Sequence, residues 1–190
     1  MRIVGGAFKG RRLAAPGGRD TRPTSDRARE SIFNIIQHGL GDWHGDLAGA
    51  SVVDVFCGTG ALGLEALSRG ATHATFIDNA GPALAMAKKN AAHLNCWRDV
   101  TLLKIDATRL APPPLASKTP VGVAFLDAPY GQELSFPALI GLRQRGWLTA
   151  GGLAVCEVAD DEELPPVPGY EILETRTYGA AKVVFLQIRD

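Results

Sequence analysis

Four residues that could act on an amine, Asp127, Ala128, Pro129 and Tyr130, directly follow an apolar segment at residues 123–126. The lone pair of a planar ring amine is delocalised, so acceptors on its two N–H groups help by stabilising the charge that develops during attack. The Asp127 carboxylate and the main-chain carbonyl of Ala128 are suitable acceptors, and Tyr130 offers a ring on which a base can stack. The plainer alternative is a turn after a strand, in which Tyr130 only packs.

A glycine-rich segment lies earlier in the chain, between an apolar run at residues 51–56 and a helical pattern at residues 61–68. Gly58, Gly60 and Gly63 have the spacing Gly-x-Gly-x-x-Gly, which lets backbone approach a ligand at the edge of an α/β sheet. This pattern alone fits a dinucleotide as well as S-adenosylmethionine. Asp78, at the end of the next apolar run, could hold ribose hydroxyls in either case.

Asp54, four residues before Gly58, favours one of these two ligands. A dinucleotide places its pyrophosphate at the helix N-terminus, where an extra carboxylate would repel it. S-adenosylmethionine has no phosphate and carries an ammonium and a sulfonium, which a carboxylate attracts. Asp106 could accept a hydrogen bond from the adenine amine, although Asp54 and Asp106 could also simply cap the helices that follow. The candidate cofactor-binding residues in this part of the chain are Asp54, Phe56, Gly58, Gly60, Asp78, Asn79, Asp106 and Ala107.

The elements that must position these residues alternate along the chain. Strand-like segments at residues 51–56, 74–78, 100–105, 121–126 and 153–158 are separated by helical patterns at residues 61–68, 82–94 and 136–145. This alternation predicts an α/β protein with a doubly wound, mostly parallel sheet. Residues 170–177 and 182–188 predict a C-terminal hairpin that adds an antiparallel strand, for seven strands in all. The acidic, proline-rich residues 160–168 are expected to form an exposed loop.

The first part of the chain has a different character. Short strand-like segments at residues 2–4 and 11–13 predict a small β-hairpin, and residues 23–25 begin a helix that carries apolar residues as far as Ile36. Residues 1–37 contain eight basic and three acidic residues, although the whole chain has no net charge. A basic arm of this kind suits a partner that carries phosphates, or it simply keeps the surface soluble. We therefore divide the chain into an extension at residues 1–39 and a catalytic domain at residues 40–190.

Several classes of protein do not fit the composition. Cys57, Cys96 and Cys156 are odd in number and form no Cys-x-x-Cys pair, so neither disulfides nor a zinc site is expected, and we interpret all three as structural thiols in a reducing compartment. The four histidines show no metal-ligand spacing. No apolar run is long enough to span a membrane, and residues 1–6 lack the apolar centre of a signal peptide. These features predict a cytoplasmic protein without a metal.

The segments described above resemble, over essentially the whole chain, the bacterial 16S rRNA guanine-N2 methyltransferases of the RsmD family. Four segments carry the resemblance, at residues 1–6 with 9–13, at residues 22–30 with Phe33 and Asn34, at residues 58–71 and at residues 127–130. The segment at residues 22–30 is the most specific, because methyltransferases in general lack it.

The resemblance implies a Rossmann-like class I methyltransferase that transfers a methyl group from S-adenosylmethionine to N2 of one guanine in 16S rRNA. The substrate would be an assembled or partly assembled small ribosomal subunit, and we expect the enzyme to be a monomer. The resemblance also implies that Thr24, Arg27 and Glu30 lie near the cofactor. The basic hairpin would contact RNA, and the candidate RNA-binding residues are Lys9, Arg11, Arg12 and Arg22.

The chain departs from the family at one position of the tetrapeptide, where Ala128 stands in place of the usual first proline. The role given to this position uses a main-chain carbonyl, which alanine also has, and Pro129 still holds residue 128 extended. We therefore expect activity to be retained. The alternatives are another amine methyltransferase, acting on adenine N6 or protein glutamine, a catalytically silent RNA-binding assembly factor and a nicotinamide oxidoreductase.

Overall fold

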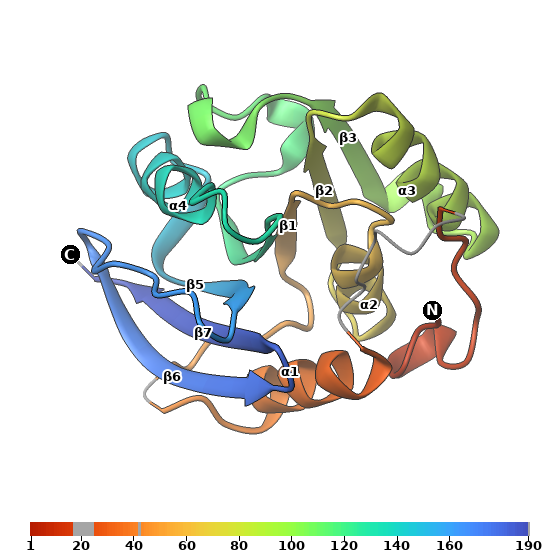
Figure 1. Cartoon of the computed structure of the whole chain (residues 1–190). Coiled ribbons are helices and arrows are strands. Elements are labelled where there is room, and N and C mark those ends of the chain that lie inside the picture. The colour runs from red at the N-terminus through yellow and green to blue at the C-terminus, as the bar shows by residue number, and fades with distance from the viewer. Residues whose placement is uncertain (17–24, 42, 190) are drawn as a thin grey trace.

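A seven-stranded sheet forms the centre of the protein, and the computed structural model describes residues 1–16, 25–41 and 43–189 (Figure 1). The strand order is β3-β2-β1-β4-β5-β7-β6. The first five strands run parallel, whereas β7 is antiparallel to both β5 and β6. The strands are β1 (Ser51–Val55), β2 (His73–Asp78), β3 (Val100–Lys104), β4 (Val121–Asp127), β5 (Leu148–Ala159), β6 (Tyr170–Tyr178) and β7 (Ala181–Ile188). The predicted doubly wound sheet with a C-terminal antiparallel strand is confirmed.

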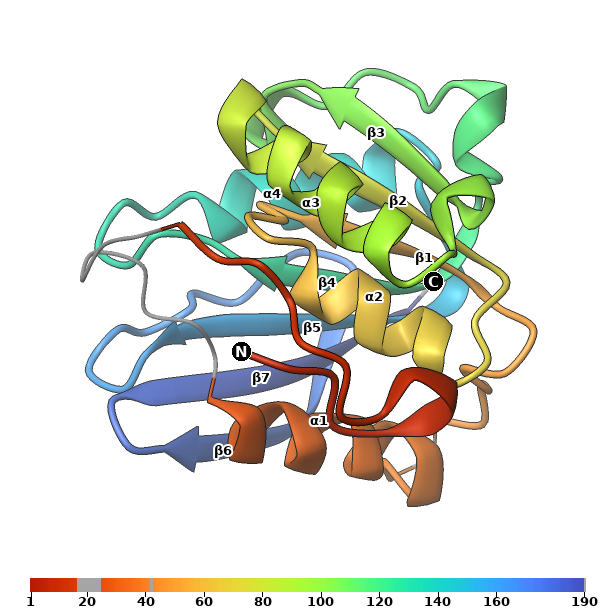
Figure 2. The same ribbon diagram turned by 90° about the vertical axis from the view of Figure 1, so that its right-hand side faces the viewer.

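Helices cover both faces of the sheet (Figures 1 and 2). On one face lie α1, α2 and α3, and on the other lies α4 with a short 3-10 helix, η3. Side chains of β4 alternate between these faces, since Val123 and Phe125 belong to the first core and Ala124 and Leu126 to the second. The helices are α1 (Asp26–His38), α2 (Ala61–Ser68), α3 (Gly81–His93) and α4 (Ser135–Gln144), and the 3-10 helices are η1 (Gly6–Phe8), η2 (Trp97–Asp99), η3 (Ala107–Arg109) and η4 (Leu115–Ser117).

The structure refines several predicted boundaries. β1 ends at Val55, because Phe56 takes a left-handed backbone conformation with a φ of 61° and starts the glycine loop. β5 begins five residues earlier than predicted, at Leu148, and its pairing with β4 shifts register before Leu153. Residues 160–169 form the expected loop between β5 and β6. Among the described residues, no helix has the length and apolar character needed to cross a membrane.

The N-terminal extension forms a hairpin that lies against the helices. Arg2 and Arg12 pair as an antiparallel bridge, and η1 closes the turn between them. Ser25 is the N-cap of α1, and its side chain accepts a hydrogen bond from the Ala28 amide at 3.1 Å. The extension shares the first core with the sheet, since Ile3 of the hairpin is buried there with α1. The division at residue 39 stays a prediction.

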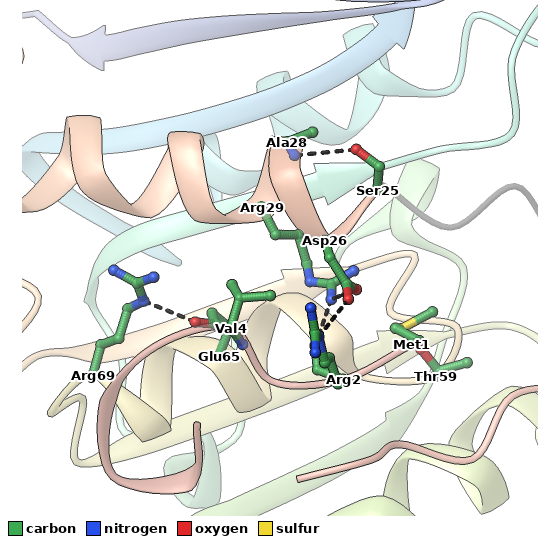
Figure 3. A network of polar contacts seen from close by, with 10 residues as sticks. All are labelled: Met1, Arg2, Val4, Ser25, Asp26, Ala28, Arg29, Thr59, Glu65 and Arg69. Atoms are coloured by element: carbon green, nitrogen blue, oxygen red, sulfur yellow. Dashed lines mark hydrogen bonds and ion pairs between the residues drawn. The ribbon is translucent and has the colours of Figure 1, made fainter. Parts of the chain in front are cut away.

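A buried ion pair ties the hairpin to α2 (Figure 3). Glu65 is 0% exposed and accepts hydrogen bonds from the Val4 amide at 2.9 Å and from Arg69 Nε at 2.8 Å. Arg69 in turn donates to Asn34 and Gln37 of α1 and lies over the Phe33 ring. One carboxylate therefore joins the hairpin, α2 and, through Arg69, α1.

This pair generates a prediction for stability. Glu65→Gln should lower the free energy of unfolding by about 3 kcal/mol, because it leaves the Arg69 guanidinium buried without its countercharge. Arg69→Met should cost a similar amount, and the double variant should cost less than the sum of the two single changes. Urea denaturation of the four proteins measures the coupling. Strictly additive losses would show that the pair contributes no interaction energy.

Candidate active site

A cavity of about 700 Å³ opens at the carboxyl ends of the parallel strands. The residues that line it come from the ends of β1, β2 and β4, from η3, from the starts of α1 and α2 and from the hairpin. These elements are far apart in the sequence. The predicted residues that line it are Asp54, Phe56, Asp78, Asn79, Asp106, Ala107, Asp127, Ala128, Pro129 and Tyr130. The sheet thus brings together ten predicted residues from four separate segments of the chain.

The glycine loop connects β1 to α2 beside this cavity. Gly60 is the N-cap of α2 and has a φ of 78°, a left-handed conformation that a side chain would strain. At Gly63, a Cβ would meet the Phe76 ring at 2.4 Å, so only glycine lets α2 approach β2 this closely. Gly58 and Gly60 lie in the loop without lining the cavity, and the Gly58 amide donates to Asp78 at 3.0 Å.

Asp54 is the most buried acid of the cavity, at 1% exposure. It accepts a hydrogen bond from the Gly63 amide, near the start of α2, at 2.8 Å. Burial raises the pKa of Asp54 well above its ordinary value, and repulsion from Asp127 and Asp78 adds to this effect. Asp54 thus makes the hydrogen bond to the start of α2 that the capping alternative expects. The same bond holds its carboxyl group in a cavity that several acids line.

Asp78 and Asp106 lie at the ends of neighbouring strands and are held by local backbone bonds. Asp78 accepts from the amides of Gly58 and Ala80 at 3.0 and 2.9 Å, which fixes its carboxylate at the end of β2. Asp106 caps η3, and its Oδ1 accepts from the amide and hydroxyl of Thr108. These hydrogen bonds from Thr108 lower the pKa of Asp106, so the exposed group is a carboxylate at neutral pH.

The tetrapeptide lies at the end of β4. Asp127 is half-buried as the last residue of that strand, and Ala128 is buried behind it. The Tyr130 hydroxyl donates a hydrogen bond to Glu157 Oε1 at 2.6 Å. Glu157 lies on β5 directly opposite Asp127 in the sheet register, and it is buried. The Tyr130 ring is thus tied to the next strand, which restricts its position in the cavity wall.

Sequence reasoning missed several residues that meet at the cavity. Arg29 of α1 lines the cavity and donates to the Arg2 carbonyl at 2.6 Å and to Asp26 at 2.7 Å (Figure 3). Met1 also lines it, and its sulfur accepts from the Thr59 hydroxyl at 3.6 Å. Glu157 carried a usable signal, since it is an acid inside the apolar segment 153–158. Met1 carried none.

The other residues of the N-terminal prediction lie elsewhere. Arg27 and Glu30 line a second hollow on the outer side of α1, and not the cavity that contains Arg29. Thr24 and Arg22 lie outside the described residues. Lys9, Arg11 and Arg12 are exposed on the hairpin. The cofactor and RNA roles of these residues stay predictions.

The cysteines are buried and have the properties of structural thiols. Burial raises the pKa of Cys96 to about 11 and that of Cys156 to about 12, and it raises the pKa of Cys57 further. A thiolate nucleophile is therefore not available at neutral pH. Within the described part of the chain, no three His, Cys, Asp or Glu side chains gather in a way that could hold a metal ion.

Comparisons with known proteins identify the family. The profile described as "Conserved hypothetical protein 95" matches residues 1–187. YlbH of Bacillus subtilis is 35% identical over 191 residues, which cover all of both chains. Ribosomal RNA small subunit methyltransferase D of Escherichia coli strain K12 is 36% identical over 169 residues, covering 88% of this chain and 79% of the relative.

A solved structure supports the same assignment. That of yhhF from Escherichia coli superposes with a TM-score of 0.81 at 30% identity, covering 100% of this chain and 98% of the other. The similarity extends over the sheet, the helices and the N-terminal extension alike, and it confirms the expected class I methyltransferase fold. The chain therefore belongs to the RsmD/YlbH family of S-adenosylmethionine-dependent methyltransferases.

Proposed function

We propose that this protein transfers a methyl group from S-adenosylmethionine to the exocyclic N2 amine of a guanine in 16S rRNA of the small ribosomal subunit. The observation that carries the proposal is that the tetrapeptide residues Asp127, Ala128 and Tyr130 line one cavity together with three acids from other segments. These acids are Asp54, Asp78 and Asp106. The relatives named as small subunit rRNA methyltransferases support the choice of substrate.

The chemistry of the lining suits the methyl donor. Four carboxyl groups, from Asp54, Asp78, Asp106 and Asp127, line the cavity together with the one cationic side chain among the described lining residues, Arg29. A pyrophosphate would be repelled by this set, whereas an ammonium and a sulfonium are attracted. We assign Asp54 to the amino-acid end of the donor, Asp78 to the ribose hydroxyls and Asp106 to the adenine amine.

When bound, the donor would supply an electrophilic methyl group and leave as S-adenosylhomocysteine. The protein has to position the amine, stabilise its developing charge and let the methylated nitrogen release one proton. Asp127 and the Ala128 carbonyl accept the two N–H groups of the amine, which favours the geometry in which its lone pair faces the methyl group. Tyr130, held by Glu157, stacks on the base. A guanine in structured RNA has to leave its helix to reach this position.

Nucleoside mass spectrometry tests the proposal. Small ribosomal subunits that lack the modification are incubated with the protein and isotopically labelled S-adenosylmethionine, and the rRNA is digested. Label is expected on N2-methylguanosine. Label that appears only on adenosine or only on protein would identify one of the alternative methyltransferases instead. Absence of any transfer by a protein that binds the donor would support a silent assembly factor.

Asp127→Asn should separate catalysis from donor binding. The amide loses the negative charge that faces the amine, so kcat should fall by about a hundredfold or more. The affinity for S-adenosylhomocysteine, measured by calorimetry, should change much less, because Asp127 is assigned to the acceptor. Equal losses in kcat and in ligand affinity would instead make Asp127 a cofactor residue.

Asp54→Asn should stabilise the free protein and weaken donor binding. The raised pKa of Asp54 means that its contribution to stability is complete below its ordinary pKa and is lost as the pH rises through the raised value. Asparagine keeps an acceptor for the Gly63 amide without the buried charge. The melting temperature of the variant should therefore exceed that of the natural protein by a growing margin as the pH rises above the ordinary pKa of an aspartate and through the raised pKa of Asp54.

The matched measurement is the shift in melting temperature that S-adenosylmethionine produces. In the natural protein this shift should grow as the pH rises, because the ionised Asp54 attracts the cationic ligand. In Asp54→Asn the shift should be smaller and nearly independent of pH. A variant with the full shift would remove Asp54 from the donor site.

A further inference from the structure

Two segments that are distant in the sequence form one continuous surface beside the cavity. Asn90 of α3 donates to the Ala14 carbonyl at 3.0 Å and accepts from the Ala14 amide at 2.8 Å. Arg11 Nη2 donates to the His93 carbonyl in the last turn of α3 at 2.6 Å. Figures 1 and 2 both draw the hairpin and α3 on the same side of the sheet. We call residues 1–15 and 79–98 together the hairpin–α3 surface.

The charged Lys and Arg side chains of this surface are not balanced by any acid within its two segments. Its two segments contain seven Lys or Arg residues and no Asp or Glu, whereas the whole chain has 20 of each class. The rest of the protein therefore has an excess of acids. Charges separated in this way produce a positive potential over one face, which attracts and orients a polyanion. The acids next to the surface are Asp78 in the cavity, Asp26 beside Arg2 and Asp99 after Arg98. Glu65 also contacts the hairpin at Val4, but it is buried and paired with Arg69.

An exposed aromatic ring lies at the end of the same surface. Trp97 is 56% exposed, whereas Trp43 and Trp147 are buried at 7% and 1%. The Arg98 guanidinium lies 4.9 Å from the centre of the Trp97 ring. A single exposed aromatic residue is ordinary on a protein surface, but a tryptophan among cations is the combination that binds single-stranded nucleic acid.

We propose that the hairpin–α3 surface binds RNA, with Lys89, Arg98 and the hairpin cations on phosphates and with an unpaired base stacked on Trp97. The inference rests on the proposed function, because it assumes an RNA substrate, and it extends RNA contact well beyond the hairpin. Lys89 is exposed on α3, one residue before Asn90, whose side chain binds the hairpin at Ala14. The surface positions a long RNA while one base enters the cavity.

Tryptophan fluorescence tests the stacking contact, with a protein-free 16S rRNA transcript as the probe. Because Trp97 is the exposed indole, stacking on it should quench the red-shifted part of the emission and leave the emission of Trp43 and Trp147 unchanged. Trp97→Phe should abolish the quenching and keep most of the affinity. Trp97→Ala should weaken binding by about tenfold. Quenching that persists in Trp97→Phe, or full affinity in Trp97→Ala, would overturn the stacking contact.

Charge reversal tests the phosphate contacts. The double variant Lys89→Glu with Arg98→Glu should bind the transcript about tenfold or more weakly, and its salt dependence should be lower by about one unit of slope per lost contact. The matched control is Arg145→Glu, an exposed arginine just after α4 on the other face of the sheet, which should bind as the natural protein does. Equal affinities of the double variant and the control would overturn the proposal.

The two proposals fail in different ways. If the natural protein methylates guanine but substitutions of Trp97, Lys89 and Arg98 leave its RNA affinity unchanged, the proposal for the hairpin–α3 surface is wrong. The proposed function then stands. If the same variants weaken RNA binding but the label appears only on adenosine, the surface stands and the guanine target is wrong. Melting temperatures and S-adenosylhomocysteine affinity, measured for every variant, verify that the fold and the cavity are intact.

Discussion

The site depends on one constraint, which is that the carboxyl ends of parallel strands meet at a single edge of the sheet. β1, β2 and β4 each end in or near an acid at this edge, so Asp54, Asp78 and Asp127 face a common cavity. Burial raises the pKa of Asp54, and repulsion from Asp127 and Asp78 raises it further. The protein therefore keeps an arrangement that is unfavourable by itself and that a bound cation relieves. The Gly63 amide, fixed by α2, is the dipole that holds the Asp54 carboxyl group in place.

The position of these acids at one edge of the sheet could be predicted from the sequence, because it depends on two local features of the chain. Apolar runs of strand length locate β1, β2 and β4, and the acid that follows or ends each run must lie at the carboxyl edge. Which side of a helix faces the cavity cannot be predicted from the local sequence, because it depends on how the helix packs. Arg27 and Arg29 are two residues apart, so they point about 200° apart around α1, and only the packing of α1 decides that Arg29 is the one at the cavity.

The pairing of β4 with β5 explains how the tetrapeptide is supported. Glu157 lies opposite Asp127, and its carboxylate accepts the Tyr130 hydroxyl. No spacing in the sequence relates residue 130 to residue 157, since their contact depends on the register of two strands separated by α4. Because this bond restrains Tyr130 from the neighbouring strand, the tetrapeptide is not held by Pro129 alone. Ala128 in place of proline therefore leaves the ring and the buried main chain at residue 128 supported.

The N-terminal extension connects the two surfaces of the molecule that the proposals assign to RNA and to the methyl donor. Arg11 contacts the end of α3, whereas Met1, at the start of the same hairpin, lines the cavity. Arg29 of α1 donates to the Arg2 carbonyl and Arg2 donates to Asp26 of α1, so two polar contacts join the hairpin to α1 beside the cavity. A phosphate that displaced or fixed the hairpin would thus change the wall of the cavity directly. The extension therefore contributes to the wall of the cavity, through Met1, and shares its buried core with the sheet, through Ile3.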